Sequence, residues 1–262
     1  MRPDLVVGTS VGAMNATFVA LDPTVRGMER LVDIWLRLKA SDLFPGSRAM
    51  SWARMVARGN RLFDNSGLRR VIGQHLGAPT FEETIVPLAM VATELETGAE
   101  TVLRSGDITR ALLASSAMPG VFPPVELGGR ALIDGGVSNN VPIGPAVEMG
   151  ANTVYVLDST SHGQENRQLA RPFDYLLHAF SLARAQRLSF DRSFYGSQAR
   201  LVMVPMPSLG FHVPMDCMDH AAAMIHMSYV QTRRFLSLGG VNESSIPAGD
   251  ATAAPARPAM GL

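Results

Sequence analysis

The hydrophobic pattern at the start of the chain predicts a buried strand, a sharp turn and a helix. Residues 5–7 (Leu-Val-Val) form a short, mostly β-branched run that is typical of a buried strand. Gly8 follows this run, and a stretch that favours helix extends over residues 11–20. The first twenty residues therefore predict a strand joined to a helix by a tight turn.

Residues 24–77 are predicted to form a helical insertion. The first helix of this region is amphipathic, because four large apolar residues recur at helical spacing: Leu31, Ile34, Trp35 and Leu38. Two shorter helices are expected over residues 52–57 and 68–76.

Strands and helices alternate in the remainder of the chain. Strands are predicted over residues 85–93, 100–103, 153–157 and 201–204, and helices over residues 108–116, 172–198 and 219–238. The pair Gly128-Gly129 separates two short strand-like runs and predicts a hairpin with a two-residue turn. This alternation indicates an α/β fold with a mainly parallel sheet between helical layers. Residues 239–262 are rich in Gly, Ala, Pro and Ser and predict a flexible tail.

Composition and charge narrow the class of protein. The chain has 262 residues, of which 47% are apolar and 18% charged, so it can bury a full-sized core. Its 23 basic and 23 acidic residues give no net charge, which argues against nucleic acid as a partner. Cys217 is the one cysteine and cannot form an intramolecular disulfide. Because the sequence shows neither a signal-peptide pattern nor an apolar span of 18 residues, a cytoplasmic protein is expected.

The first candidate for chemistry is the pentapeptide Gly8-Thr9-Ser10-Val11-Gly12. In a G-x-S-x-G pattern the glycines are expected to relieve clashes in a strand-to-helix turn that exposes the serine hydroxyl. The pattern alone is weak, since a chain of this composition would contain it by chance with a probability of roughly one in six. Its position between a predicted strand and a predicted helix is the context that favours a nucleophilic Ser10. The start of that helix would also favour an anionic intermediate beside the serine.

A serine nucleophile needs a base, and the residues leave two arrangements open. In a triad, Ser10 and Asp134 would be joined by one of five downstream histidines: His162, His178, His212, His220 or His226. None of these histidines lies in a distinctive loop motif. In a dyad, a carboxylate would accept the proton directly, and Asp134 is the candidate because Gly135 and Gly136 follow it at a strand end and allow close backbone approach.

Three segments resemble the patatin-like phospholipase family, in the order in which that family carries them. They are PDLVVGTSVGAMNA at 3–16, ALLASSAMPGVFPPV at 111–125 and ALIDGGVSNNVPIGPAVEMGA at 131–151. The resemblance implies a three-layer α/β/α sandwich over residues 1–238 with a mainly parallel central sheet. It also implies that Ser10 is the nucleophile and Asp134 the general base of a dyad, with Gly8, Val11 and Gly12 forming the elbow and oxyanion site and with Gly135 and Gly136 supporting the aspartate.

The activity implied by this resemblance is hydrolysis of acyl esters, in the manner of a phospholipase or lysophospholipase, through an acyl-enzyme. No metal and no cofactor is expected, and the expected partner is a lipid or another acyl ester, with transient contact to a membrane surface.

One part of the family's pattern is missing from the printed sequence. Patatin-like proteins begin with a strand and a Gly-Gly-Gly-x-[RK]-Gly loop that donates backbone N–H groups to the oxyanion, and here only the Val11 N–H is left for that role. Losing one such donor typically lowers kcat by about 10²- to 10³-fold. Gly128 and Gly129 are not assigned to this role, because they fit a hairpin turn better. We expect the cellular protein to be longer at its N-terminus, with the first βα unit missing here. The alternative is a truncated, catalytically silent relative that acts as a binding or scaffold module.

Overall fold

The computed structural model describes residues 2–44, 63–159, 172–207 and 217–240. The strands are β1 (Val6–Thr9), β2 (Leu88–Glu94), β3 (Glu100–Leu103), β4 (Val125–Leu127), β5 (Arg130–Asp134), β6 (Thr153–Val156) and β7 (Arg200–Met203). The helices are α1 (Val11–Leu21), α2 (Val25–Arg37), α3 (Ala40–Leu43), α5 (Ser66–Leu76), α6 (Ile108–Ser115), α7 (Ile143–Glu148), α8 (Pro172–Tyr195) and α9 (Ala221–Ser237), with short 3₁₀ turns η1 (Phe81–Glu83) and η2 (Gly135–Val137).

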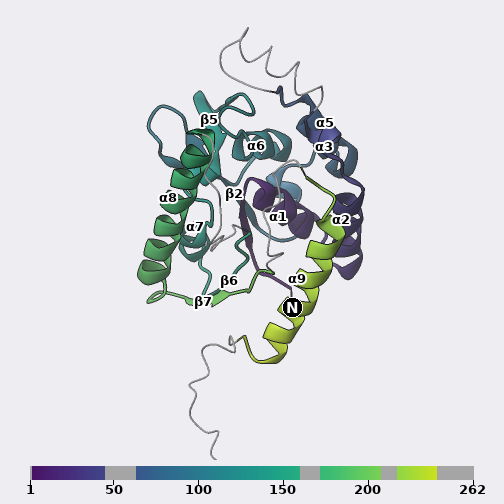
Figure 1. The fold of residues 1–262 in the computed structure, drawn as a ribbon, viewed down its shortest axis with the longest axis vertical. Coiled ribbons are helices and arrows are strands. Elements are labelled where there is room, and N and C mark those ends of the chain that lie inside the picture. The colour runs from purple at the N-terminus through teal and green to yellow at the C-terminus, as the bar shows by residue number, and fades with distance from the viewer. Residues whose placement is uncertain (1, 45–62, 160–171, 208–216, 241–262) are drawn as a thin grey trace, which may run out of the picture.

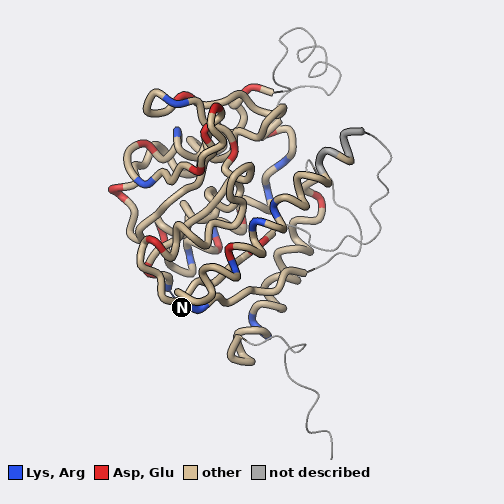
Figure 2. Tube along the Cα trace, turned by 90° about the vertical axis from the view of Figure 1, so that its left-hand side faces the viewer, with Lys and Arg blue, Asp and Glu red and all other residues tan. Residues whose placement is uncertain are grey.

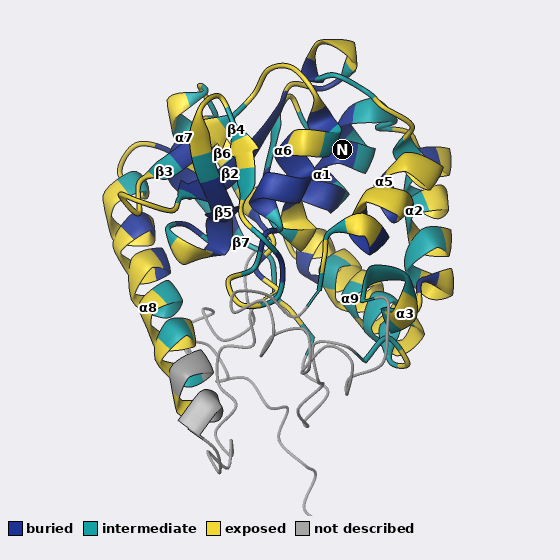
Figure 3. Ribbon diagram, turned by 90° about the horizontal axis from the view of Figure 1, so that it is seen from above, coloured by how far each residue is buried: buried dark blue, intermediate teal, exposed yellow. Residues whose placement is uncertain are grey.

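The strands and helices form three layers (Figure 1). Helices α1 and α6 pack on one face of the sheet, with α2 and α5 outside them, and α7 and α8 cover the other side (Figure 3). The α/β sandwich expected from the sequence is therefore confirmed, and the helices predicted in the 24–77 region are found as α2 and α5. The predicted helix at 52–57 and the predicted tail beyond residue 240 lie outside the described residues.

The sheet is mixed rather than uniformly parallel. β1 pairs with β2 in parallel, and β6 pairs with β7 in parallel as a separate two-stranded sheet. β2 is antiparallel to β3 and to β5, and β4 is antiparallel to β5. The expected parallel pairing thus holds for two strand pairs. The β2–β3 and β4–β5 pairs are antiparallel because short turns join consecutive strands.

The predicted glycine hairpin is present between β4 and β5. Gly128 and Gly129 have φ values of 61° and 74°. Positive φ at both central positions is what a type I′ turn requires, and glycine adopts it without strain. The two glycines therefore serve the turn, as expected.

The main core lies between the sheet and the α1/α6 layer. Completely or almost completely buried residues there come from β2, α5 and α6, among them Met90, Ile72 and Leu112. A smaller cluster of Ile143, Val156 and Leu188 joins α7, β6 and α8 on the other side. The first cluster packs α1, α5 and α6 against β2, and the second packs α7 and α8 against β6.

Charged residues are spread over the described chain. Acidic and basic positions are interspersed along the trace, as Figure 2 shows, in keeping with the balanced composition. None of the described helices combines the length and the apolar character that crossing a bilayer requires.

Candidate active site

Ser10 occupies a strained turn between β1 and α1. Its φ and ψ are 54° and −122°, and it is the one described residue other than glycine with a positive φ. Such a conformation is unfavourable for a residue with a side chain and marks a position that the surrounding structure holds in place. The predicted strand, sharp turn and helix are thus found at the predicted residues.

The two glycines of the pentapeptide differ in what they allow. A Cβ at Gly8 would overlap the backbone carbonyl of Gly12, so glycine is required there. At Gly12 itself a Cβ would meet no described atom within 4 Å. The expectation that a side chain would clash is therefore right for Gly8 and wrong for Gly12, because the face of α1 at Gly12 is open.

The structure brings Ser10 and Asp134 together across 124 residues of sequence. The Ser10 hydroxyl donates a hydrogen bond to Asp134 Oδ2 at 2.7 Å. Asp134 ends β5 and is 2% exposed, whereas Ser10 is half-buried. In the part of the chain that the structure describes, the Ser10 hydroxyl is bonded to this carboxylate and to no histidine. His162 and His212, two candidates for a triad, lie outside the described residues.

The other carboxylate oxygen of Asp134 is fixed by the glycine pair that follows. Gly136 N–H donates to Asp134 Oδ1 at 2.7 Å. A Cβ at Gly135 would overlap the carbonyl of Val91, so only glycine lets the chain pass β2 at this point. Gly135 and Gly136 therefore support the carboxylate through backbone geometry.

Burial and hydrogen bonding act on the Asp134 carboxyl in opposite directions. Its pKa is raised above the ordinary value of 3.8, chiefly because burial disfavours the charged form. The Ser10 hydroxyl, the Gly136 N–H and the positive charge of Arg184 oppose this rise. The carboxylate is consequently a stronger base than an exposed aspartate.

Backbone donors point from the beginning of α1 beside Ser10. The Ser10 carbonyl accepts from the amides of Ala13 and Met14 at 2.9 and 3.2 Å. Among the described residues the amides of Val11 and Gly12 have no acceptor, as is general for the first turn of a helix. These amides can stabilise negative charge that develops near Ser10.

Sequence reasoning did not identify Ser115 as part of the site. Its hydroxyl accepts from the Ser10 backbone N–H at 2.9 Å and donates to the Val91 carbonyl at 2.6 Å. The side chain is completely buried at the end of α6. It therefore ties the strained turn to β2. The available signal was the pair Ser115-Ser116 in the otherwise apolar run at 111–117.

Replacing Ser115 with alanine should lower the free energy of unfolding by about 1–3 kcal/mol, because the half-buried Ser10 N–H would lose its acceptor. Chemical denaturation monitored by circular dichroism measures this change. Ser116→Ala is the matched control, since the hydroxyl of this half-buried neighbour makes no hydrogen bond among the described residues. Equal stability of the two variants would contradict the role given to Ser115.

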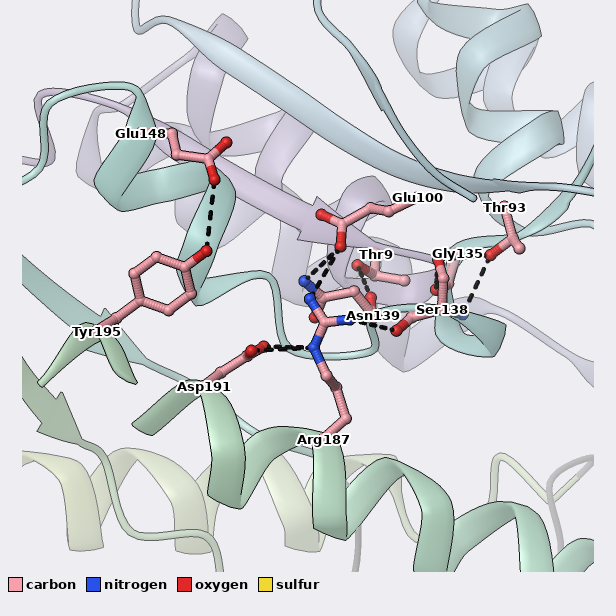
Figure 4. Close-up of polar contacts among 10 residues, drawn as sticks. All are labelled: Thr9, Thr93, Glu100, Gly135, Ser138, Asn139, Glu148, Arg187, Asp191 and Tyr195. Carbon is pink, nitrogen blue, oxygen red and sulfur yellow. Dashed lines mark hydrogen bonds and ion pairs between the residues drawn. The ribbon is translucent and has the colours of Figure 1, made fainter. Parts of the chain in front are cut away.

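A second set of polar contacts connects the loop after Asp134 to β1 (Figure 4). Thr9 Oγ1 donates to the Asn139 carbonyl at 3.0 Å, and Asn139 Nδ2 donates to Glu100 of β3 at 3.1 Å. Both Thr9 and Asn139 are buried. The strand before Ser10 and the loop after Asp134 are thus joined independently of the Ser10–Asp134 hydrogen bond.

Helix α8 contributes an arginine to the same set of contacts. Arg187 Nη2 pairs with Glu100 at 3.2 Å, and its Nε pairs with the buried carboxylate of Asp191 at 2.9 Å (Figure 4). Its Nη1 reaches the Ser138 carbonyl at 3.5 Å. α8 is therefore anchored to β3 and to the loop after Asp134.

No metal site accompanies Ser10 and Asp134 in the described residues, where no group of three or more His, Cys, Asp or Glu side chains could hold an ion. The chemistry available at this point is that of a hydroxyl, a buried carboxylate and backbone amides.

Comparison with known proteins finds similarity to one family. Residues 1–147 match the family model described as patatin-like phospholipase. Patatin-like phospholipase domain-containing protein 6 of Homo sapiens is 28% identical over 163 residues, which is 62% of this chain and 11% of that protein. Lysophospholipase NTE1 of Debaryomyces hansenii is 26% identical over 159 residues, 59% of this chain and 10% of that protein.

A shorter match connects the chain to a bacterial protein. An uncharacterized NTE family protein of Mycobacterium tuberculosis is 35% identical over 77 residues, 29% of this chain and 21% of that protein. The chain thus spans only 10 to 21% of the length of these three relatives.

Proposed function

The chain belongs to the patatin-like phospholipase family, and from this we propose that it hydrolyses carboxylic (acyl) esters of lipids with Ser10 as nucleophile and Asp134 as general base. The observation that carries the proposal is the 2.7 Å hydrogen bond from Ser10 Oγ to Asp134 Oδ2 at a strained strand-to-helix turn. A nucleophile in direct contact with its base is the geometry that such catalysis needs.

The reaction would proceed in two stages. Ser10 Oγ attacks the ester carbonyl while Asp134 takes the hydroxyl proton, and the resulting oxyanion is stabilised by the amide of Val11. Asp134 then returns the proton to the leaving alcohol, which produces the acyl-enzyme. In the second stage Asp134 takes a proton from the water that attacks the acyl-enzyme. It then returns this proton to Ser10 Oγ as the ester bond breaks, which releases the fatty acid and restores both residues.

The raised pKa of Asp134 supports this role. An ordinary aspartate is a weak base at neutral pH, and burial makes this carboxylate more basic. The hydrogen bond from Gly136 N–H orients the carboxylate so that Oδ2 remains available for the Ser10 proton.

The substrate class we propose is a phospholipid or lysophospholipid. The name of the Debaryomyces hansenii relative, a lysophospholipase, supports this choice over a soluble ester. Contact with a membrane surface would follow from such a substrate, and a cytoplasmic location remains part of the proposal.

The test is covalent labelling together with turnover. The purified chain is incubated with a fluorophosphonate, digested and analysed by mass spectrometry, and hydrolysis of lysophosphatidylcholine and of p-nitrophenyl esters is measured in parallel. We expect a single adduct on the peptide that contains Ser10 and loss of hydrolysis in proportion to labelling, because a phosphonylated Ser10 cannot attack an ester. A folded protein that neither labels nor hydrolyses would instead support the silent binding or scaffold module.

A further inference from the structure

Arg184 reaches from α8 to the loop that holds the proposed base. Its Nε donates to the Gly136 carbonyl at 2.7 Å, and its guanidinium carbon lies 4.0 Å from the centre of the Phe180 ring one turn earlier on α8. The side chain is half-buried. Stacking on an aromatic ring and a charge-assisted hydrogen bond together restrict the guanidinium to one orientation.

The same glycine connects Arg184 to Asp134. Gly136 donates its N–H to Asp134 Oδ1 at 2.7 Å and accepts from Arg184 through its carbonyl. A Cβ at Gly136 would overlap the Arg184 guanidinium and come within 2.9 Å of Asn140 Oδ1. Glycine at this position therefore lets the arginine lie directly against the loop.

We propose that Arg184 is a positioning residue for the reaction, which holds the Gly136 turn under the Asp134 carboxylate and places a positive charge beside this buried group. The inference rests on the proposed function, since it assigns a role within the same site. Nothing in the sequence motifs points to Arg184, which lies 50 residues beyond Asp134.

The charges around Arg184 agree with this role. The positive charge of Arg184 lowers the pKa of Asp134 against the larger effect of burial. In turn, burial lowers the pKa of Arg184, whereas the carboxylates of Asp134 and Asp158 raise it. Asp158, which follows β6 and is 8% exposed, is thus the other acidic group that faces this guanidinium.

Other charged groups near α8 pair with one another. Arg187, one turn after Arg184, pairs with Glu100 from β3 and with Asp191 on its own helix. Arg184 is accordingly the arginine whose charge acts on Asp134, and Arg187 anchors the helix.

The test compares Arg184→Gln with Arg184→Lys in the pH profile of kcat/KM for Ser10-dependent hydrolysis. Without the positive charge, protonation of Asp134 becomes easier, so the acid limb of R184Q should move upward by on the order of one pH unit. Its kcat should also fall, because the Gly136 turn loses the hydrogen bond from Arg184. Lysine keeps the charge but lacks the planar guanidinium, so R184K should retain the wild-type acid limb with a lower kcat. Arg192→Gln, at an exposed position on the same helix, is the matched control and should behave as wild type.

The outcomes distinguish a failure of the proposed function from a failure of the role given to Arg184. Wild-type protein without any hydrolysis contradicts the proposed function itself. Active wild-type protein together with an R184Q acid limb at the wild-type pH overturns the role of Arg184, even if kcat falls. If thermal unfolding shows that R184Q does not fold, R184K decides, because an acid limb displaced upward in a variant that keeps the charge contradicts the proposal.

Discussion

Replacing Ser10 with alanine should lower ester hydrolysis by on the order of 10⁴- to 10⁶-fold, because the proposed acyl-enzyme forms on the Ser10 hydroxyl. The substitution removes one hydroxyl and leaves the backbone contacts of the turn intact, including the Ser10 N–H bond to Ser115. Steady-state hydrolysis of lysophosphatidylcholine measures the loss of activity. The unfolding temperature of the same samples shows whether the turn keeps its contacts. The unfolding temperature should change little.

The control for this substitution is a serine of comparable chemistry away from the site. Ser237 at the end of α9 is exposed, and its hydroxyl donates to the Arg234 carbonyl at 2.8 Å. Ser237→Ala should keep full activity. If S10A retained more than about a tenth of the wild-type rate, a different nucleophile would be responsible and the proposed function would be wrong.

Much of the fold near Ser10 could be predicted from the sequence because it depends on local patterns. The run at residues 5–7, the following glycine and the apolar stretch after it predict β1, the turn and α1, and these elements lie where expected. The glycine pair 128–129 likewise predicted a hairpin that is present. The predicted ends of these and other strands and helices differ from the observed ends by up to three residues. β2, for example, begins at Leu88 rather than at Ile85, after Pro87, which cannot donate to a strand.

The parts that the sequence did not predict depend on contacts between distant segments. Ser115 and Arg184 lie in ordinary helical sequence, and their roles come from packing of α6 and α8 on opposite sides of the sheet. No spacing rule connects either residue to Ser10. The pairing of Asp134 with Ser10 was expected from the Asp-Gly-Gly motif at a strand end and from the family resemblance. Periodicity did not predict it, because hydrophobic patterns do not determine which loops meet.

The wrong expectation of a clash at Gly12 also arose because a sequence pattern does not show which atoms are neighbours in space. The G-x-S-x-G pattern suggested that both glycines relieve a clash, but only Gly8 faces backbone across the turn. Whether a glycine is sterically required depends on what lies beside it in space, which the pentapeptide does not specify.

Asp134→Asn should lower kcat/KM by on the order of 10³- to 10⁴-fold, since an amide of nearly the same shape cannot accept the Ser10 proton. Its oxygen can still accept from Gly136 N–H, so the loop should keep its conformation. Asp33→Asn, on the exposed face of α2, is the matched control. Single replacement of each of the five candidate histidines by asparagine should leave turnover nearly unchanged, and a loss of several orders of magnitude at one of them would favour a triad instead.

The same carboxylate predicts opposite effects of pH on activity and on stability. Hydrolysis requires the ionised form, so activity should fall as the pH falls through the raised pKa of Asp134, which lies above 3.8. Because the folded-state pKa is higher than the unfolded value, protonated Asp134 favours the folded state, and this contribution is lost as the pH rises from 3.8 through the folded-state pKa. D134N lacks this titration, so at neutral pH its unfolding temperature should equal or exceed that of the wild type. A clearly less stable D134N at neutral pH would mean that the hydrogen bonds of the carboxylate outweigh the cost of burying its charge.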